Sequence, residues 1–208
     1  MKSKIIIFDF DGVLVNTLPR WFDLASIHNP DITYKYFQDL SNGNFHEVTA
    51  RMSDQKVYVI PPKNEEHHSM WLKETELVPQ MYELVQELSK EYTLFVVSSA
   101  LTSNIVEYFE RVGLREYFQS IRGFDVHFSK IIKINNILEQ EKVDPKDVVF
   151  ITDTLGDIRE GNVCKVYSIG VTWGLHDRET LEKGEPVAIV DTVSELKQSI
   201  ESILNVDK

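Results

Sequence analysis

Short apolar runs that alternate with longer stretches of helical periodicity are the feature that most restricts the fold of this chain. The runs are rich in β-branched residues and nearly continuous in apolar character, which is typical of strands covered on both faces of a parallel sheet. Strands are expected at residues 5–8, 93–97, 148–151, 166–171 and 187–190. The alternation predicts an α/β fold in which helices connect parallel strands.

Between the runs, apolar residues recur at intervals of three and four, which predicts covering helices around residues 78–88, 105–112 and 131–138. Residues 18–76 break the alternation, since no strand stands out there and Asn-Pro, Asn-Gly and Pro-Pro pairs interrupt the segment. Structureless loops of this length are rare in compact domains. We therefore expect a catalytic core of residues 1–17 and 77–208, with residues 18–76 inserted as a small, mostly helical module.

The overall charge bears on the partners. With 33 acidic and 22 basic residues among 208, the net charge is −11, which repels nucleic acid but leaves room for a small anion at a local positive site. The single cysteine, Cys164, cannot form an internal disulfide. The apolar run Ile5 to Phe8 is too short for a signal peptide or a membrane span, so we expect a cytoplasmic protein without membrane contact. A monomer or a homodimer is expected.

Polar residues follow the expected strands at the positions where ligands bind to open parallel sheets. They are Asp9 and Asp11 after the first strand, Ser98 and Ser99 after the second, Asp153 and Asp157 after the fourth, and Lys130 at an expected helix start after the third strand region. Each of these residues, taken alone, more often has a structural role than a functional one. Their conjunction at one edge of one sheet predicts a site.

The residue types indicate the chemistry. A turn at Gly12 can bring Asp9 and Asp11 toward one pocket, where Asp9 can act as a nucleophile and Asp11 as a general acid and base. Several carboxylates close together are costly without a cation, and oxygen ligands favour Mg²⁺. Asp9, Asp11, Asp153 and Asp157 are the candidate metal residues. Ser98, Ser99 and Lys130 are expected to hold phosphoryl oxygens.

These segments resemble the motifs of the haloacid-dehalogenase-like superfamily, in its phosphoglycolate-phosphatase-like and β-phosphoglucomutase-like branch. The similar segments are IIIFDFDGVLVNT at residues 5–17, VVSSA at residues 96–100, Lys130 in FSKII, and ITDTLGDI at residues 151–158. The sequence departs from the family pattern at Thr152, where glycine is usual, at Ser98, where threonine is usual, and at Ile131, where proline commonly follows the lysine. The last difference leaves Lys133 open as the phosphate-binding lysine.

The resemblance implies a Rossmann-like parallel sheet sandwiched by helices, with a helical cap after the first strand. It also implies a Mg²⁺-dependent phosphatase of a small phosphorylated metabolite, in which Asp9 is phosphorylated and Asp11 is the acid and base. Asp153 would bind Mg²⁺ with Asp9 and the Asp11 carbonyl, and Asp157 would support the metal. In the cap, Arg20, Arg51, His67 and His68 could reach a substrate but are more often surface residues.

Other interpretations remain open. A phosphomutase needs the same core and differs in how the cap excludes water. A catalytically quiet binding protein is disfavoured because the candidate set is complete. A phosphonatase would need a buried cap lysine, for which Lys35, Lys56, Lys63 and Lys73 are available without a distinguishing context. A phosphoacceptor receiver domain carries no inserted cap, and the dehalogenases of the superfamily lack the second aspartate.

Overall fold

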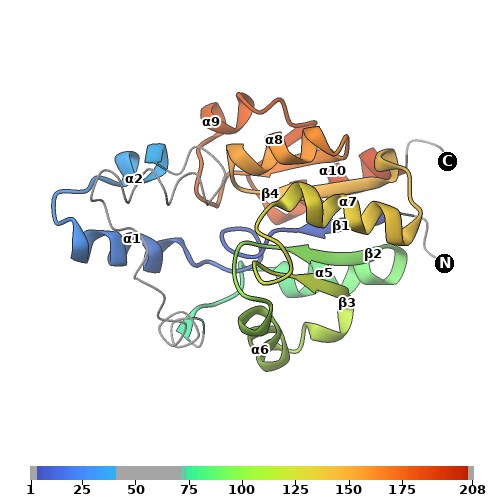
Figure 1. Cartoon of the computed structure of the whole chain (residues 1–208), viewed down its shortest axis with the longest axis horizontal. Coiled ribbons are helices and arrows are strands. Elements are labelled where there is room, and N and C mark those ends of the chain that lie inside the picture. Colours follow the sequence, from blue (N-terminus) through green and yellow to red (C-terminus); the bar gives the residue numbers. More distant parts are fainter. Residues whose placement is uncertain (1–3, 41–71, 73, 206–208) are drawn as a thin grey trace.

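One six-stranded sheet forms the centre of the molecule in a computed structural model, which describes residues 4–40, 72 and 74–205 (Figure 1). The strand order is β3-β2-β1-β4-β5-β6, and all neighbouring strands are parallel. The strands are β1 (Ile5–Phe8), β2 (Thr93–Val97), β3 (Phe118–Arg122), β4 (Val148–Thr152), β5 (Tyr167–Val171) and β6 (Ala188–Val190). The predicted α/β, Rossmann-like fold class is confirmed.

Helices cover both faces of the sheet, as the continuous apolar strands require. Successive residues of β1 point to opposite faces, so Ile6 and Phe8 join one hydrophobic cluster while Ile5 and Ile7 join the other. Helices α5, α6 and α10 pack on the first face, and α7 and α8 pack on the second (Figure 1). Their bounds are α5 (Met81–Glu91), α6 (Thr102–Val112), α7 (Lys130–Glu141), α8 (Leu155–Val163) and α10 (Val193–Leu204), with α9 (Arg178–Glu182) beside β6.

Local signals fix several helix ends. The Thr154 hydroxyl accepts a hydrogen bond from the Asp157 N–H and so caps the start of α8. Gly113 ends α6 with φ of 75°, a left-handed conformation that glycine adopts without a steric penalty. Short 3₁₀ turns at Arg115–Tyr117 and Pro145–Asp147 lead into β3 and β4.

Strand β3 was not among the runs that the sequence singled out. It lies at the edge of the sheet, where Gln119 is exposed and Ser120 is half-buried, so its polar residues interrupt the apolar run. The segment forms a strand because it pairs with β2. A search for continuous apolar runs, which are typical of strands buried on both faces, does not find it.

Helices α1 (Leu18–His28) and α2 (Tyr34–Leu40) follow β1 and extend away from the sheet, on the side opposite the two termini (Figure 1). The aromatic side chains of Phe22, Tyr34 and Phe37 pack against one another between them. The expected module of residues 18–76 therefore begins with two helices. Its division from the core stays a prediction, and Arg51, Lys56, Lys63, His67, His68 and Lys73 lie outside the described residues.

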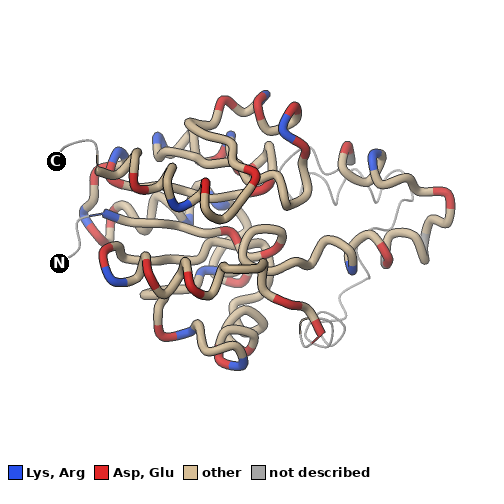
Figure 2. The backbone as a smooth tube through the Cα atoms, turned by 180° about the vertical axis from the view of Figure 1, so that it is seen from behind, with Lys and Arg blue, Asp and Glu red and all other residues tan. Residues whose placement is uncertain are grey.

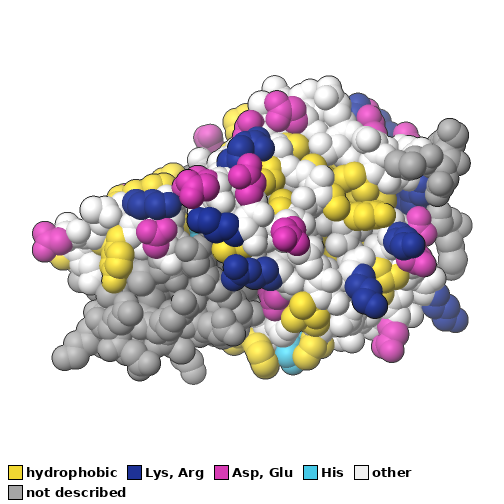
Figure 3. Space-filling view, turned by 90° about the horizontal axis from the view of Figure 1, so that it is seen from above, with side chains coloured by type: hydrophobic (Ala, Val, Ile, Leu, Met, Phe, Trp, Pro, Cys, Tyr) yellow, Lys and Arg dark blue, Asp and Glu magenta, His cyan; other side chains and the backbone are white. Residues whose placement is uncertain are grey.

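Charged residues occur around the whole core, and acidic positions also occur at the end of the sheet that adjoins α1 (Figure 2). On the face seen in Figure 3, basic and acidic side chains are interspersed and do not separate by sign. No described helix has both the length and the apolar character needed to cross a lipid bilayer.

Candidate active site at the carboxyl end of the sheet

Sheet register brings the first, second and fourth strands to the same edge. Phe8 pairs with Val96 on one side and with Ile151 on the other, and the Asp9 N–H donates to the Ile151 carbonyl at 2.9 Å. Asp9, Ser98 and Asp153 each lie one or two residues beyond these pairs. The predicted meeting of the three segments is therefore a consequence of parallel pairing in this strand order.

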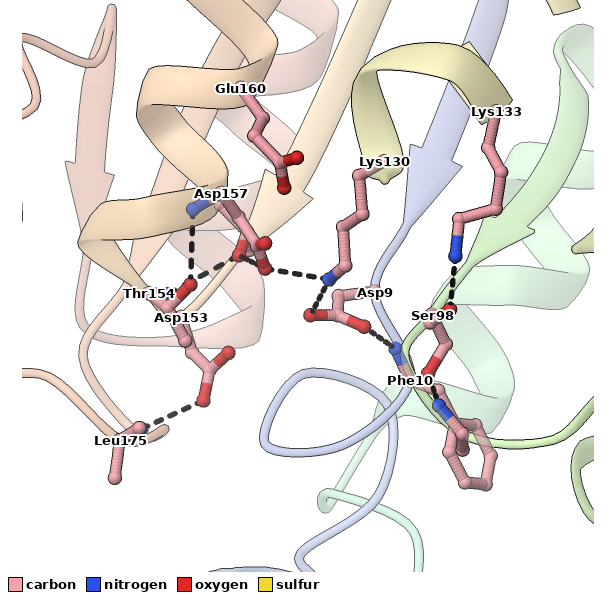
Figure 4. A network of polar contacts seen from close by, with 12 residues as sticks. Asp9, Phe10, Ser98, Lys130, Lys133, Asp153, Thr154, Asp157, Glu160 and Leu175 are labelled. Atoms are coloured by element: carbon pink, nitrogen blue, oxygen red, sulfur yellow. Dashed lines mark hydrogen bonds and ion pairs between the residues drawn. The ribbon is translucent and has the colours of Figure 1, made fainter. Parts of the chain in front are cut away.

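Lys130 lies between two buried carboxylates (Figure 4). Its Nζ is 2.6 Å from Asp9 Oδ2 and 2.7 Å from Asp157 Oδ2, and all three side chains are buried. Lys130 is the first residue of α7, so its side chain leaves the helix beside the end of β1. Between the two lysines that the sequence left open, Lys130 is the one that contacts Asp9.

The second oxygen of Asp9, Oδ1, accepts a hydrogen bond from the Phe10 N–H at 2.7 Å. Burial raises the pKa of Asp9 well above its ordinary value, against the opposing attraction of Lys130. Burial acts in the same direction on Asp157, but Lys130 and hydrogen bonds, including one from the Thr152 hydroxyl at 2.9 Å, bring its pKa below the ordinary value. Thr152, which departs from the family pattern, therefore supports the ionised form of Asp157.

Asp153 lies in a tight backbone environment. Its Oδ2 accepts the Leu175 N–H at 2.8 Å, and a Cβ added to Gly12 would lie 2.0 Å from the same oxygen. A Cβ added to Gly174 would lie 2.1 Å from the Asp153 Cβ. Burial raises the pKa of Asp153 to about 7, although the Leu175 N–H opposes this. The two glycines allow the loops after β1 and β5 to approach this carboxylate closely.

The carboxylates fit a hard divalent cation on three observations. Asp9, Asp153 and Asp157 are buried; Lys130 is the only basic side chain of the described residues that forms ion pairs with them, to Asp9 and Asp157; and the pKa of Asp9 and of Asp153 is raised. Asp11 Oδ1 is buried and has no hydrogen-bond partner among the described residues. Additional positive charge here would favour ionisation of these groups.

Within the described part of the chain, no three His, Cys, Asp or Glu side chains are grouped as a complete metal cage. Mg²⁺ does not require one, since it usually retains waters and binds through one or two carboxylates together with substrate phosphate. The donor set that the sequence predicts, Asp9, Asp153 and the Asp11 carbonyl, would be of this kind. Mg²⁺ therefore remains a prediction that the chemistry of the residues supports.

The segment after β2 carries the two serines. Ser98 is buried, its Oγ accepts the Ala100 N–H at 3.0 Å, and its carbonyl accepts Lys133 Nζ at 2.6 Å. Ser99 is half-buried. Both serines therefore lie at the expected edge, and Lys133 is adjacent to the backbone of Ser98.

Sequence reasoning missed the contacts between the loop after β5 and helix α2. The buried His176 accepts the Leu155 N–H on Nδ1 at 2.9 Å, and its Nε2 is 3.3 Å from the Gln38 carbonyl. The Gln38 side chain donates to the Leu175 carbonyl, and Lys35 pairs with Asp177 at 3.3 Å. Nothing in the spacing of these residues indicated the contact, because they are about 140 positions apart in the sequence.

The chain is similar to known proteins along most of its length. The sequence pattern of the haloacid dehalogenase-like hydrolases matches residues 6–171. Phosphoglycolate phosphatase of Synechococcus elongatus is 26% identical, covering 97% of this chain and 99% of that protein. Pyrophosphatase PpaX of Bacillus cereus is 25% identical, with coverages of 94% and 95%.

Among solved structures, a haloacid dehalogenase-like family hydrolase from Streptococcus pneumoniae superposes with a TM-score of 0.77 at 21% identity. The alignment covers 96% of this chain and 99% of that chain, so the two share the fold. The family pattern spans most of the sequence and includes all the strand ends that carry Asp9, Ser98 and Asp153. The chain belongs to the haloacid dehalogenase-like hydrolase family.

Proposed function

We propose that the chain is a Mg²⁺-dependent phosphatase that hydrolyses a small phosphorylated metabolite through a phosphoaspartyl intermediate on Asp9. One observation carries the proposal: Asp9 is buried at the end of the central strand, with one carboxylate oxygen held by the Phe10 N–H and the other by Lys130. The names of the relatives, a phosphoglycolate phosphatase and a pyrophosphatase, support hydrolysis of a phosphate ester or anhydride.

In the first step an oxygen of Asp9 attacks phosphorus, the bond from phosphorus to the leaving oxygen breaks, and Asp11 gives that oxygen a proton. In the second step Asp11 takes a proton from water, and the water oxygen attacks phosphorus. The bond from phosphorus to Asp9 then breaks, which releases phosphate and regenerates the carboxylate. Lys130 and the hydroxyl of Ser98, with Ser99, would hold the phosphoryl oxygens.

Asp9, Asp153 and the Asp11 carbonyl would hold Mg²⁺, with Asp157 supporting the site. When bound, the ion would neutralise charge on the nucleophile and on the phosphoryl oxygens. Lys130 complements this by keeping Asp157 and Asp9 close while their charges repel.

The segment of residues 18–76 is proposed to act as a cap that selects the substrate and excludes water. In support of this, Gln38 of α2 donates to the Leu175 carbonyl in the loop after β5, and the Leu175 N–H in turn donates to Asp153. The alternative of a phosphomutase keeps the same steps at Asp9 but returns the phosphoryl group to a sugar hydroxyl in place of water. Phosphate release distinguishes the two.

The test is phosphate release from a panel of small phosphomonoesters with Mg²⁺, for the wild type, Asp9→Asn and Asp11→Asn. Asp147→Asn serves as the matched control, because Asp147 precedes β4 at the opposite end of the sheet. We expect Asp9→Asn and a chelator to abolish release and Asp147→Asn to retain it. Acid-quenched wild type should carry a phosphoryl group on the peptide that contains Asp9. A folded wild type that releases no phosphate but isomerises a sugar phosphate would favour the mutase.

A further inference from the structure

Lys133 is a second buried lysine beside the proposed phosphoryl site. It is fully buried, with 0% of its surface exposed, and it lies one turn after Lys130 on α7. Its Nζ donates to the Ser98 carbonyl at 2.6 Å and to the Gly123 carbonyl at 3.3 Å. Both lysines point from the helix toward the end of the sheet (Figure 4).

The two carbonyls belong to different segments. Ser98 follows β2 and Gly123 follows β3, so one ammonium group joins the loops that leave two neighbouring strands. The loop after β2 is also held by the Ser98 N–H, which donates to the Arg122 carbonyl at 3.1 Å, and by the Thr102 N–H, which donates to Asp125 at 2.7 Å. The loop is thus held at both ends, and Lys133 contacts the carbonyl of the peptide between Ser98 and Ser99.

That orientation matters for an anion. The described backbone contains no cis peptide, and in a trans peptide the C=O and the following N–H point in opposite directions. Because the Ser98 carbonyl is directed at Lys133, the Ser99 N–H is directed away from it. No acceptor for this N–H lies within the described part of the chain.

A buried lysine is costly, which argues against a role in packing alone. Burial and the repulsion of Lys130 lower the pKa of Lys133 to about 8. A side chain such as methionine would fill the same volume without that cost. The carboxylates of Asp9, Asp157 and Glu160 attract the ammonium from the site, and Asp125 attracts it from the loop after β3.

We propose that Lys133 is a positioning residue of the phosphoryl site, which fixes the Ser98–Ser99 peptide so that the Ser99 N–H donates to a phosphoryl oxygen. The inference rests on the proposed function and deepens it. A preorganised N–H donor stabilises charge that develops in the transition state, and removal of such a donor lowers kcat by about 100- to 1,000-fold. A donor that is misaligned but still present should cost less, about 10- to 100-fold.

The test compares Lys133→Met with the wild type and with Lys90→Met, an exposed lysine on α5 that serves as the matched control. We expect kcat/KM for the best phosphomonoester to fall about 10- to 100-fold in Lys133→Met. Thermal unfolding checks that the variant is folded, because the substitution removes a buried charge but also takes the donor from the Ser98 and Gly123 carbonyls. Lys90→Met should match the wild type. Lys133→Gln, which keeps N–H donors without the charge, provides a second folded variant and should lose less activity.

A direct readout is the amide proton of Ser99 in nitrogen-15 NMR during titration with inorganic phosphate. In the wild type the resonance should move downfield, and in Lys133→Met the shift should be absent or smaller. An active wild type whose Ser99 amide does not respond to phosphate would overturn the inference, as would a Lys133→Met variant with unchanged kinetics. A wild type that releases no phosphate from any ester would instead refute the proposed phosphatase.

Discussion

Replacement of Lys130 by methionine should reveal how the buried carboxylates are balanced. Lys130 is the ion-pair partner of both Asp9 and Asp157, at 2.6 and 2.7 Å, and all three side chains are buried. Removing one partner of a buried pair leaves uncompensated charge and typically costs about 3–5 kcal/mol. With a urea m value of about 2–3 kcal/mol/M, the midpoint of unfolding should fall by roughly 1–2.5 M.

The loss should depend on pH. Without Lys130 the pKa values of Asp9 and Asp157 in the folded state rise above those in the unfolded chain, so the folded state binds more protons. Stability then increases as pH falls, and the deficit relative to the wild type should shrink between about pH 8 and pH 5. The assay is urea unfolding at both pH values with a chelator present, so that no divalent cation replaces the lysine.

The control is Lys197→Met, because Lys197 pairs with Glu87 at the same distance of 2.6 Å but at the surface. Exposed pairs contribute little to stability, so this variant should unfold near the wild-type midpoint. Equal midpoints for Lys130→Met and Lys197→Met, or a deficit of the same size at pH 8 and pH 5, would refute this account of the site.

The remaining predictions concern the approach of backbone to the site, the core beneath it and the cap. Gly12 and Gly113 have nearly the same φ, 72° and 75°, but of the two only Gly12 would bring an added Cβ into collision with Asp153. Gly12→Ala should therefore abolish phosphate release, whereas Gly113→Ala should lose only about 1–2 kcal/mol of stability in thermal unfolding. Phe10 is fully buried, so Phe10→Ala should lower the free energy of unfolding by about 3–5 kcal/mol in urea titration, and Phe10→Leu by less. Gln38→Ala removes one hydrogen bond between α2 and the loop after β5. This variant should raise KM about two- to tenfold with little change in kcat. An unchanged KM would mean that this contact does not affect substrate binding.

The sequence alone was sufficient for five of the six strands and for the edge of the sheet where the candidate site lies. Ile5 to Phe8 and Val148 to Ile151 are apolar at every position, and such runs are stable only when both faces of a strand are covered. Parallel strands end at one edge, so Asp9, Ser98 and Asp153 had to lie near one another once the strands were adjacent.

The edge strand β3 was harder to predict because Gln119 and Ser120 interrupt its apolar pattern. The contact of His176 and Gln38 was also invisible in the sequence, since neither residue type requires a partner at any fixed spacing. Both features depend on pairing between segments that are distant along the chain.

The tertiary structure alone decided between the two lysines of α7. Lys130 and Lys133 are one turn apart and emerge on the same side of the helix, so their spacing allowed either to reach Asp9. Helix α7 starts at Lys130 and packs across β2. This position places the Lys130 Nζ between two carboxylates and the Lys133 Nζ against the Ser98 carbonyl. Sequence determines which groups a helix presents, whereas the position of the helix on the sheet determines what each group contacts.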